Sequence, residues 1–157
     1  MVRARMKYWL PVIAWMLLIF IASTDLMSAQ HTSQIIGPFL LWLKPDISPE
    51  GIRAVQFAVR KAAHVTEYAI LAALLVRAFH GGARTVRWTH VTGAVSIAST
   101  YAALDELHQS FVASRTGSPA DVLIDAAGAA LGACAFWWVI TRRRTDVRDG
   151  STARTLA

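Results

Sequence analysis

Four apolar runs limit what this chain can fold into. They cover about residues 8–23, 52–79, 88–111 and 120–140. A helix needs about 20 apolar residues to cross the roughly 30 Å of hydrocarbon in a bilayer, and these runs reach or approach that length. A shorter run, 35–43, cannot cross and is expected to lie at the membrane surface. The sequence therefore predicts an all-α membrane protein with four transmembrane helices and a short interfacial helix between the first and second.

The composition supports a membrane protein, because 55% of the 157 residues are hydrophobic, 17% are charged and the mean hydropathy is +0.41. The basic start of the first run is typical of a signal peptide, but no small-x-small cleavage site follows it, so we expect an uncleaved helix. We expect one transmembrane domain over residues 1–140. A basic cytoplasmic tail over 141–157 is expected to be disordered.

The net charge of +6 could indicate a nucleic-acid partner, but most basic residues flank the apolar runs, where they anchor membrane helices. Cytoplasmic flanks carry an excess of Lys and Arg. Three basic segments share one side of a four-span topology: Arg3, Arg5 and Lys7; Arg77, Arg84 and Arg87; and Arg142, Arg143, Arg144, Arg148 and Arg154. We therefore place both termini in the cytoplasm and expect the lipid bilayer, and no nucleic acid, as a partner.

Polar residues concentrate in the outer half of this topology. The candidate ligand-binding residues are Lys61, His64, Glu67, Tyr68, Asp105, Glu106, His108, Gln109, Arg115, Asp121 and Asp125. An unpaired charge near the centre of a bilayer costs about 2.5–3.5 kcal/mol on insertion scales, so these groups need partners. The expected pairs join separate helices: Lys61 or Arg60 with Asp105, Glu106 or Asp125, and Arg115 with Asp121.

These residues allow three kinds of chemistry, and their density favours a water-accessible ligand site over pairs that only hold helices together. General acid–base work would use Glu67, Asp105, Glu106 or His108, with His64 as a further partner. The phosphate or carboxylate of an amphipathic ligand could be held by Lys61, His64, His108 and Arg115. A metal such as zinc could bind the histidines and carboxylates, but no H-E-x-x-H or paired-cysteine spacing supports it. We expect no metal and no cofactor.

Local signals mark the ends of one helix and one close helix contact. Ser48 and Pro49 fit the N-cap and first position of a helix, and Gly81 fits its end. Gly128 and Gly132 form a small-xxx-small pair, which lets two helix backbones approach closely.

The polar motifs follow one another in a specific order. They are Lys61-x-x-His64-x-x-Glu67-Tyr68, Asp105-Glu106-x-His108-Gln109-x-Phe111, Arg115, and Asp121-Val122-Leu123-x-x-x-x-Gly128-x-x-x-Gly132, after Ile19-Phe20-x-x-Ser23 in the first run. This ordered set resembles the VanZ-like family of bacterial integral membrane proteins, from about Leu10 to Ile140. Val112-Ala113-Ser114 departs from the more usual Val-Pro-Gly, and Asp125 stands where Asn is also familiar.

The resemblance implies a multi-pass protein of the bacterial cytoplasmic membrane with a role in the cell envelope. The founding member is similar to an accessory factor for low-level resistance to the glycopeptide teicoplanin, and the family has no settled biochemical activity. The first hypothesis is an envelope factor that binds a lipid-linked or peptidoglycan-related ligand, or a glycopeptide. The alternatives are a membrane-embedded hydrolase or transferase acting on a lipid-linked substrate, and a structural subunit of a membrane complex.

Overall fold

The computed structural model describes residues 2–24, 29–83, 85–112 and 117–155, with side chains for 6–24, 33–83, 85–112 and 117–142. The described residues form five helices and no strand. The helices are α1 (Val2–Ala22), α2 (Ala29–Leu43), α3 (Pro49–His80), α4 (Trp88–Gln109) and α5 (Pro119–Thr155). The predicted all-α fold class is therefore confirmed.

The limits of α3 follow the local signals in the sequence. The Ser48 side chain accepts a hydrogen bond from the Gly51 N–H at 3.1 Å, and Pro49 lies in the first turn. At the other end Gly81 has a φ of 54°, and its N–H donates to the Arg77 carbonyl. This left-handed conformation strains residues that carry a Cβ, so glycine ends the helix.

The last helix differs from its predicted limits. We expected the fourth apolar run to end near Ile140 and a disordered tail to follow. In the structure α5 continues through the basic segment to Thr155. Proline is the residue that most strongly breaks a helix, and none follows Pro119, so the chain contains no strong signal for a stop.

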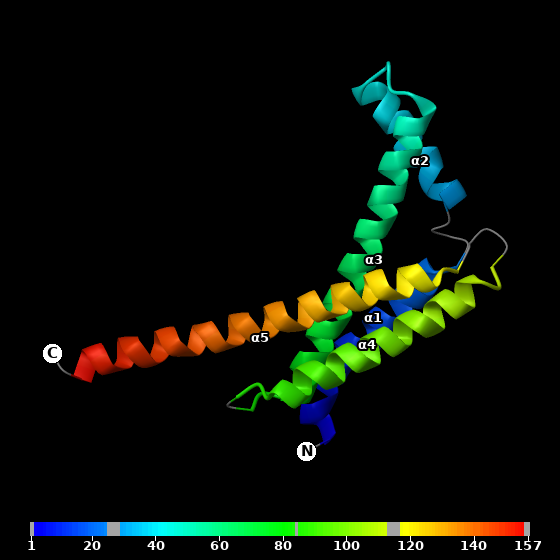
Figure 1. Ribbon diagram of the computed structural model, residues 1–157. Coiled ribbons are helices and arrows are strands. Elements are labelled where there is room, and N and C mark those ends of the chain that lie inside the picture. The colour runs from blue at the N-terminus through cyan, green and yellow to red at the C-terminus, as the bar shows by residue number, and fades with distance from the viewer. Residues whose placement is uncertain (1, 25–28, 84, 113–116, 156–157) are drawn as a thin grey trace.

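Helices α1, α3, α4 and α5 alternate in direction along the chain (Figure 1). The contacts that set these directions are Trp9–Phe79 and Trp15–Glu67 between α1 and α3, Met16–Tyr101 and Phe20–His108 between α1 and α4, and Trp88–Trp137 and Glu106–Ser118 between α4 and α5. Between α1 and α4 the numbers of the contacting residues rise together, so these two helices are parallel. Between α1 and α3, and between α4 and α5, they change in opposite senses, so these pairs are antiparallel. Thus α1 and α4 run one way, while α3 and α5 run the other.

Two glycines bring α5 against the backbone of α3. A Cβ added to Gly128 would lie 2.6 Å from the Val65 carbonyl oxygen, and one on Gly132 would overlap the backbone of Ala69. Buried alanines on α4 and α5, such as Ala98 and Ala129, extend this close packing into the core. The Gly-xxx-Gly pair therefore acts as a helix contact, as the sequence predicts.

The first part of α3 projects beyond the other helices, and α2 packs against it (Figure 1). Helix α2 includes the short apolar run 35–43 and contains Pro38. The predicted short helix between the first and second apolar runs is therefore present, and it begins six residues earlier than that run.

Two of the described helices are long and apolar enough to cross a membrane, Pro49–His80 and Pro119–Arg142. The sequence predicts four. The described apolar part of α1, Met6–Ala22, is shorter, and α4 carries Asp105 and Glu106 among many small residues. Small and acidic side chains contribute little apolar surface, which explains why α4 falls below the apolar character of a spanning helix.

Candidate functional site

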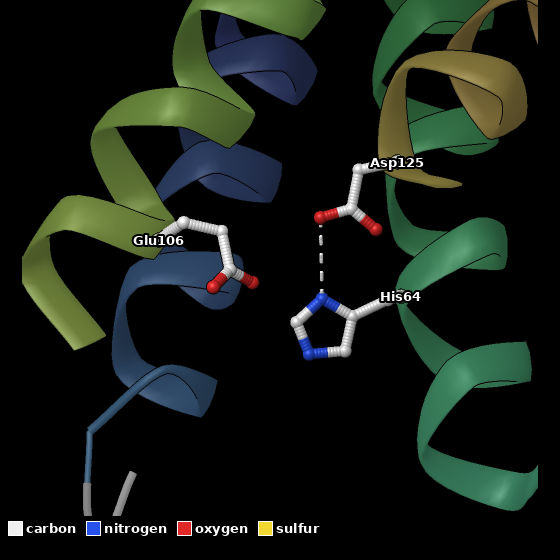
Figure 2. Close-up of side chains that lie close together, drawn as sticks. All are labelled: His64, Glu106 and Asp125. Carbon is white, nitrogen blue, oxygen red and sulfur yellow. Dashed lines mark hydrogen bonds and ion pairs between the residues drawn. The ribbon is translucent and has the colours of Figure 1, made fainter. Parts of the chain in front are cut away.

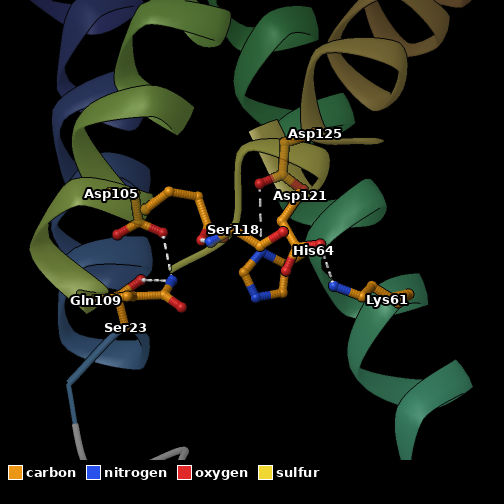
Figure 3. Close-up of polar contacts among 9 residues, drawn as sticks. Ser23, Lys61, His64, Asp105, Gln109, Ser118, Asp121 and Asp125 are labelled. Atoms are coloured by element: carbon orange, nitrogen blue, oxygen red, sulfur yellow. Dashed lines mark hydrogen bonds and ion pairs between the residues drawn. The ribbon is translucent and has the colours of Figure 1, made fainter. Parts of the chain in front are cut away.

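Polar groups from α3, α4 and α5 meet beside the end of α1, at one end of the helix assembly (Figure 3). We call this group the polar cluster. It consists of Ser23 beside α1, Lys61 and His64 on α3, Asp105, Glu106 and Gln109 on α4, Ser118 before α5, and Asp121 and Asp125 on α5. Seven of its nine members come from the set that the sequence singles out.

The α3–α5 side of the cluster contains two ion pairs. Lys61 Nζ contacts Asp121 Oδ1, and His64 Nδ1 lies 3.4 Å from Asp125 Oδ2. Both pairs follow from the helix register, because Asp125 precedes Gly128 by about one turn on the face that touches α3. The same close contact that fits Gly128 against α3 therefore brings the two aspartates opposite Lys61 and His64.

The α4 side is held by one amide. Gln109 Nε2 donates to Asp105 Oδ2 at 2.9 Å and to Ser23 Oγ at 3.4 Å. All three side chains are buried, with 3–5% of their surface exposed. A buried carboxylate needs donors, so Gln109 stabilises Asp105 and ties α4 to the end of α1.

Glu106 connects α4 to the start of α5. Its Oε2 accepts a hydrogen bond from the Ser118 N–H at 2.8 Å. Gly117 passes so close to the Glu106 carbonyl oxygen that a Cβ there would overlap it. The turn before α5 is thus folded directly over Glu106.

His64, Glu106 and Asp125 converge from three different helices (Figure 2). One potential ligand atom of each lies within 4.8 Å of the others. Glu106 is 5% exposed and Asp125 is fully buried. Glu106 Oε1 and Asp125 Oδ1 have no hydrogen-bond partner among the residues that the structure describes.

Other predicted site residues are not among the three converging side chains, although Tyr68 lies close enough to Asp105 and Asp125, and Glu67 to His64, to interact electrostatically. The His108 ring packs on Phe20, with the ring centroids 4.9 Å apart. Tyr68 is fully buried in the apolar core, and the backbone carbonyl of Glu67 accepts from Trp15. Arg115 lies outside the described residues.

The predicted partners of Lys61 were wrong, while the predicted pair of Arg115 with Asp121 lies outside the described residues. Lys61 contacts Asp121 instead of Asp105, Glu106 or Asp125, and the carboxylate opposite His64 is Asp125. The ion pairs of the described residues do not include Arg60. Sequence position gives the face of a helix on which a charge lies, but it does not give the rotation and shift of one helix against another. The rotation and shift between helices determine which charged residue becomes the ion-pair partner.

The described part of the cluster is acidic. Lys61 contacts Asp121, and three further buried carboxylates, those of Asp105, Glu106 and Asp125, lie nearby with His64 as the one other basic group. Such a group accepts hydrogen bonds and attracts cations. It is poorly suited to holding a phosphate without a positive charge from elsewhere.

Sequence reasoning named His64, Glu106 and Asp125 singly and did not group them. Their separations along the chain match no ligand motif, because each comes from a different helix. The one available signal was that all three fall in the same half of a four-span topology.

Two cavities among the described residues lie away from the polar cluster. One of about 580 Å³ lies between α1 and the end of α3, lined by Lys7, Tyr8 and Phe79 among others. Another, of about 300 Å³, lies between α1 and α4 at Met16 and Thr100. Neither is lined by a member of the polar cluster.

A model of the VanZ/LLP1 family matches residues 8–141 of the chain, which include every member of the polar cluster. Searches of curated proteins and of solved structures found no match. The family match covers most of the chain and agrees with the ordered motifs. This protein therefore belongs to the VanZ/LLP1 family.

Proposed function

We propose that this protein spans the cytoplasmic membrane four times and uses the polar cluster, facing the cell exterior, to bind the polar head of a cell-wall ligand. The observation that carries the proposal is the meeting of polar groups from α3, α4 and α5 at one end of the assembly, where those of α4 and Asp125 of α5 are buried. A chain has no structural need for so many polar groups at one depth, since one or two pairs suffice to set helix register.

The alternating helix directions support four spans. With α1 and α4 running one way and α3 and α5 the other, each connection lies at the end required by an up-and-down topology. Helix α4 has 22 residues, a length of about 33 Å, which suits a bilayer. Asp105 and Glu106 face neighbouring helices, so their charge does not have to meet lipid.

The two ends of the assembly differ in chemistry. The end opposite the polar cluster carries basic and aromatic side chains, such as Lys7 and Arg77 beside Tyr8, and Arg142 over Trp138 at 4.3 Å. Basic flanks mark the cytoplasmic side, and aromatic residues gather where bilayer meets water. The acidic end would then face outward, which agrees with both termini in the cytoplasm.

The acidity of the cluster favours ligands that present hydroxyl or amino groups. The sugars and peptide of a lipid-linked or peptidoglycan-related precursor carry both, and so does a glycopeptide. The VanZ family is linked to glycopeptide resistance. We therefore infer a role in the cell envelope, with teicoplanin-type glycopeptides or wall precursors as the ligand class.

A second candidate is a membrane-embedded hydrolase or transferase. The contact between His64 and Asp125 favours it, because a carboxylate that orients an imidazole is a common part of general acid–base sites. Glu106, within 4.8 Å, would supply the other acid or base. Turnover of a polyprenyl-phosphate substrate by the purified protein would support this candidate over the binding factor.

Two measurements test the main proposal. Reporter fusions at Gly82 and Gly117 should report the cytoplasm and the exterior, respectively, and an exterior signal at Gly82 would contradict the topology. Expression in a teicoplanin-susceptible Gram-positive host should raise resistance, and Glu106→Gln should abolish that rise at equal membrane abundance. Asp46→Asn, an exposed acid outside the cluster, is the matched control and should keep it. Loss of membrane abundance alone in the Glu106 variant would favour the structural-subunit hypothesis.

A further inference from the structure

The carboxylates of the polar cluster exceed the positive charges that the structure places beside them. Lys61 contacts Asp121, while Glu106 and Asp125 share His64 as their nearest basic group. Among the described residues, two buried carboxylates with at most one imidazolium leave negative charge in surroundings of low dielectric constant. Such an arrangement is costly unless a cation or proton joins it.

The two carboxylates also present unused oxygens. Ser118 occupies Glu106 Oε2 and His64 contacts Asp125 Oδ2, which leaves Glu106 Oε1 and Asp125 Oδ1 buried without a hydrogen-bond partner among the described residues. Figure 2 shows these carboxylates and the imidazole pointing toward one another. Nearly all buried polar atoms in proteins have a partner, so an oxygen without one on each of these two neighbouring carboxylates leaves both able to bind a further ligand.

We propose that His64, Glu106 and Asp125 bind one divalent transition-metal ion, of the kind represented by Zn²⁺ or Mn²⁺. One imidazole nitrogen and two carboxylate oxygens suit these ions, whereas Mg²⁺ and Ca²⁺ prefer oxygen ligands throughout. Three protein ligands leave at least one coordination position open for water or a ligand group.

The geometry allows the ion with small side-chain movements. Bonds of about 2.0–2.2 Å in a tetrahedral site place ligand atoms about 3.4 Å apart. The three ligand atoms already lie within 4.8 Å of one another, so side-chain rotations would close the remaining gap. The backbone around the site has little freedom to move. Gly128 packs α5 against the backbone of α3, and the Ser118 N–H in the turn before α5 donates a hydrogen bond to Glu106.

This site was missed in the sequence because no two of its ligands share a helix. The usual metal motifs place two ligands on one helix or one turn, a few residues apart. The metal site does not depend on the cell-wall ligand proposed above. A protein without the ion could still bind a glycopeptide or a precursor through the same carboxylates.

The test uses the full-length protein, purified in detergent without a histidine tag and titrated with Co²⁺ and Zn²⁺. Co²⁺ bound to these three ligands should give visible absorption at one equivalent per chain, and Zn²⁺ should abolish it by competition. Mg²⁺ and Ca²⁺ at the same concentration should not compete. His64→Gln and Asp125→Asn should weaken Co²⁺ binding by at least about 100-fold, more than changes to residues around a metal's ligands typically do.

The matched controls are His90→Gln and Asp46→Asn, which change the same residue types outside the polar cluster and should leave the affinity unchanged. The proposal is overturned if folded wild-type protein binds no stoichiometric Co²⁺ or Zn²⁺. It is also overturned if the His64 and Asp125 variants bind as tightly as the controls. The wild-type titration decides the matter even if these variants fail to fold. A negative titration with intact teicoplanin resistance would reject the metal and keep the proposed function.

Discussion

His64 Nδ1 lies 3.4 Å from Asp125 Oδ2, across the contact between α3 and α5. The Asp125 side chain is fully buried, and its position on α5 is set by the glycines that follow it. The candidate site is therefore built beside the close contact that these glycines make with the α3 backbone.

Gly128→Ala should lower the free energy of unfolding by about 1–3 kcal/mol, the usual effect of overpacking. The added Cβ would lie 2.6 Å from the Val65 carbonyl oxygen, and backbone cannot move aside as a side chain can. The matched control is Gly93→Ala on α4, where the Cβ would rest 3.6 Å from the Phe79 ring. That change should be neutral or stabilise by up to about 1 kcal/mol through helix propensity. Equal melting temperatures for the two variants in one detergent would contradict the close contact.

Lys61 and Asp121 should show energetic coupling. Lys61→Gln and Asp121→Asn each leave the other charge without its partner, and the double variant removes both charges. The side chains are 24% and 20% exposed, so we expect a coupling free energy of about 1 kcal/mol, toward the upper end for partly exposed pairs. Unfolding of the four proteins of the cycle measures it. Strictly additive effects would mean that the pair does not form.

Gln109→Leu should destabilise the protein by about 1–3 kcal/mol, because it leaves the Asp105 carboxylate buried without its donor. Adding Asp105→Leu should recover part of that loss, since the unsatisfied group is then gone. Gln34→Leu, at an exposed position on α2, serves as the control and should stay within about 0.5 kcal/mol. If the double variant is less stable than Gln109→Leu alone, the role given to Gln109 is wrong.

Cysteines at positions 23 and 109 should crosslink in membranes. The Ser23 hydroxyl and the Gln109 amide are 3.4 Å apart, so a short thiol crosslinker can join the replacements. The background needs Cys134→Ala, because that native thiol is free and exposed. A pair at Ser23 and Trp88 is the control, since Trp88 lies at the other end of α4, about 30 Å away along the helix. If only the control pair crosslinks, α4 runs antiparallel to α1, which would contradict the arrangement described above.

Much of this protein was predictable from local patterns. The all-α class, the limits of α3 with its Ser48 cap and Gly81 end, and the glycine contact of α5 all depend on residues close together in the chain. Seven members of the polar cluster also came from one observation, the concentration of polar residues in one half of a four-span topology. Of the four predicted spans, two are supported by the length and composition of their helices. The extension of α5 to Thr155 was missed because basic, polar composition suggested disorder, while no residue there stops a helix.

Sequence alone therefore determined where the main helices lie, where their polar residues concentrate, and which family the motifs resemble. The tertiary structure decided that Lys61 meets Asp121, that His64, Glu106 and Asp125 share one point, and that His108 packs on Phe20 instead. The reason is physical. Hydrogen bonding within a helix fixes the order of side chains around its own axis, whereas the rotation and shift between helices depend on packing across the whole interface, here on where two glycines let the backbones touch.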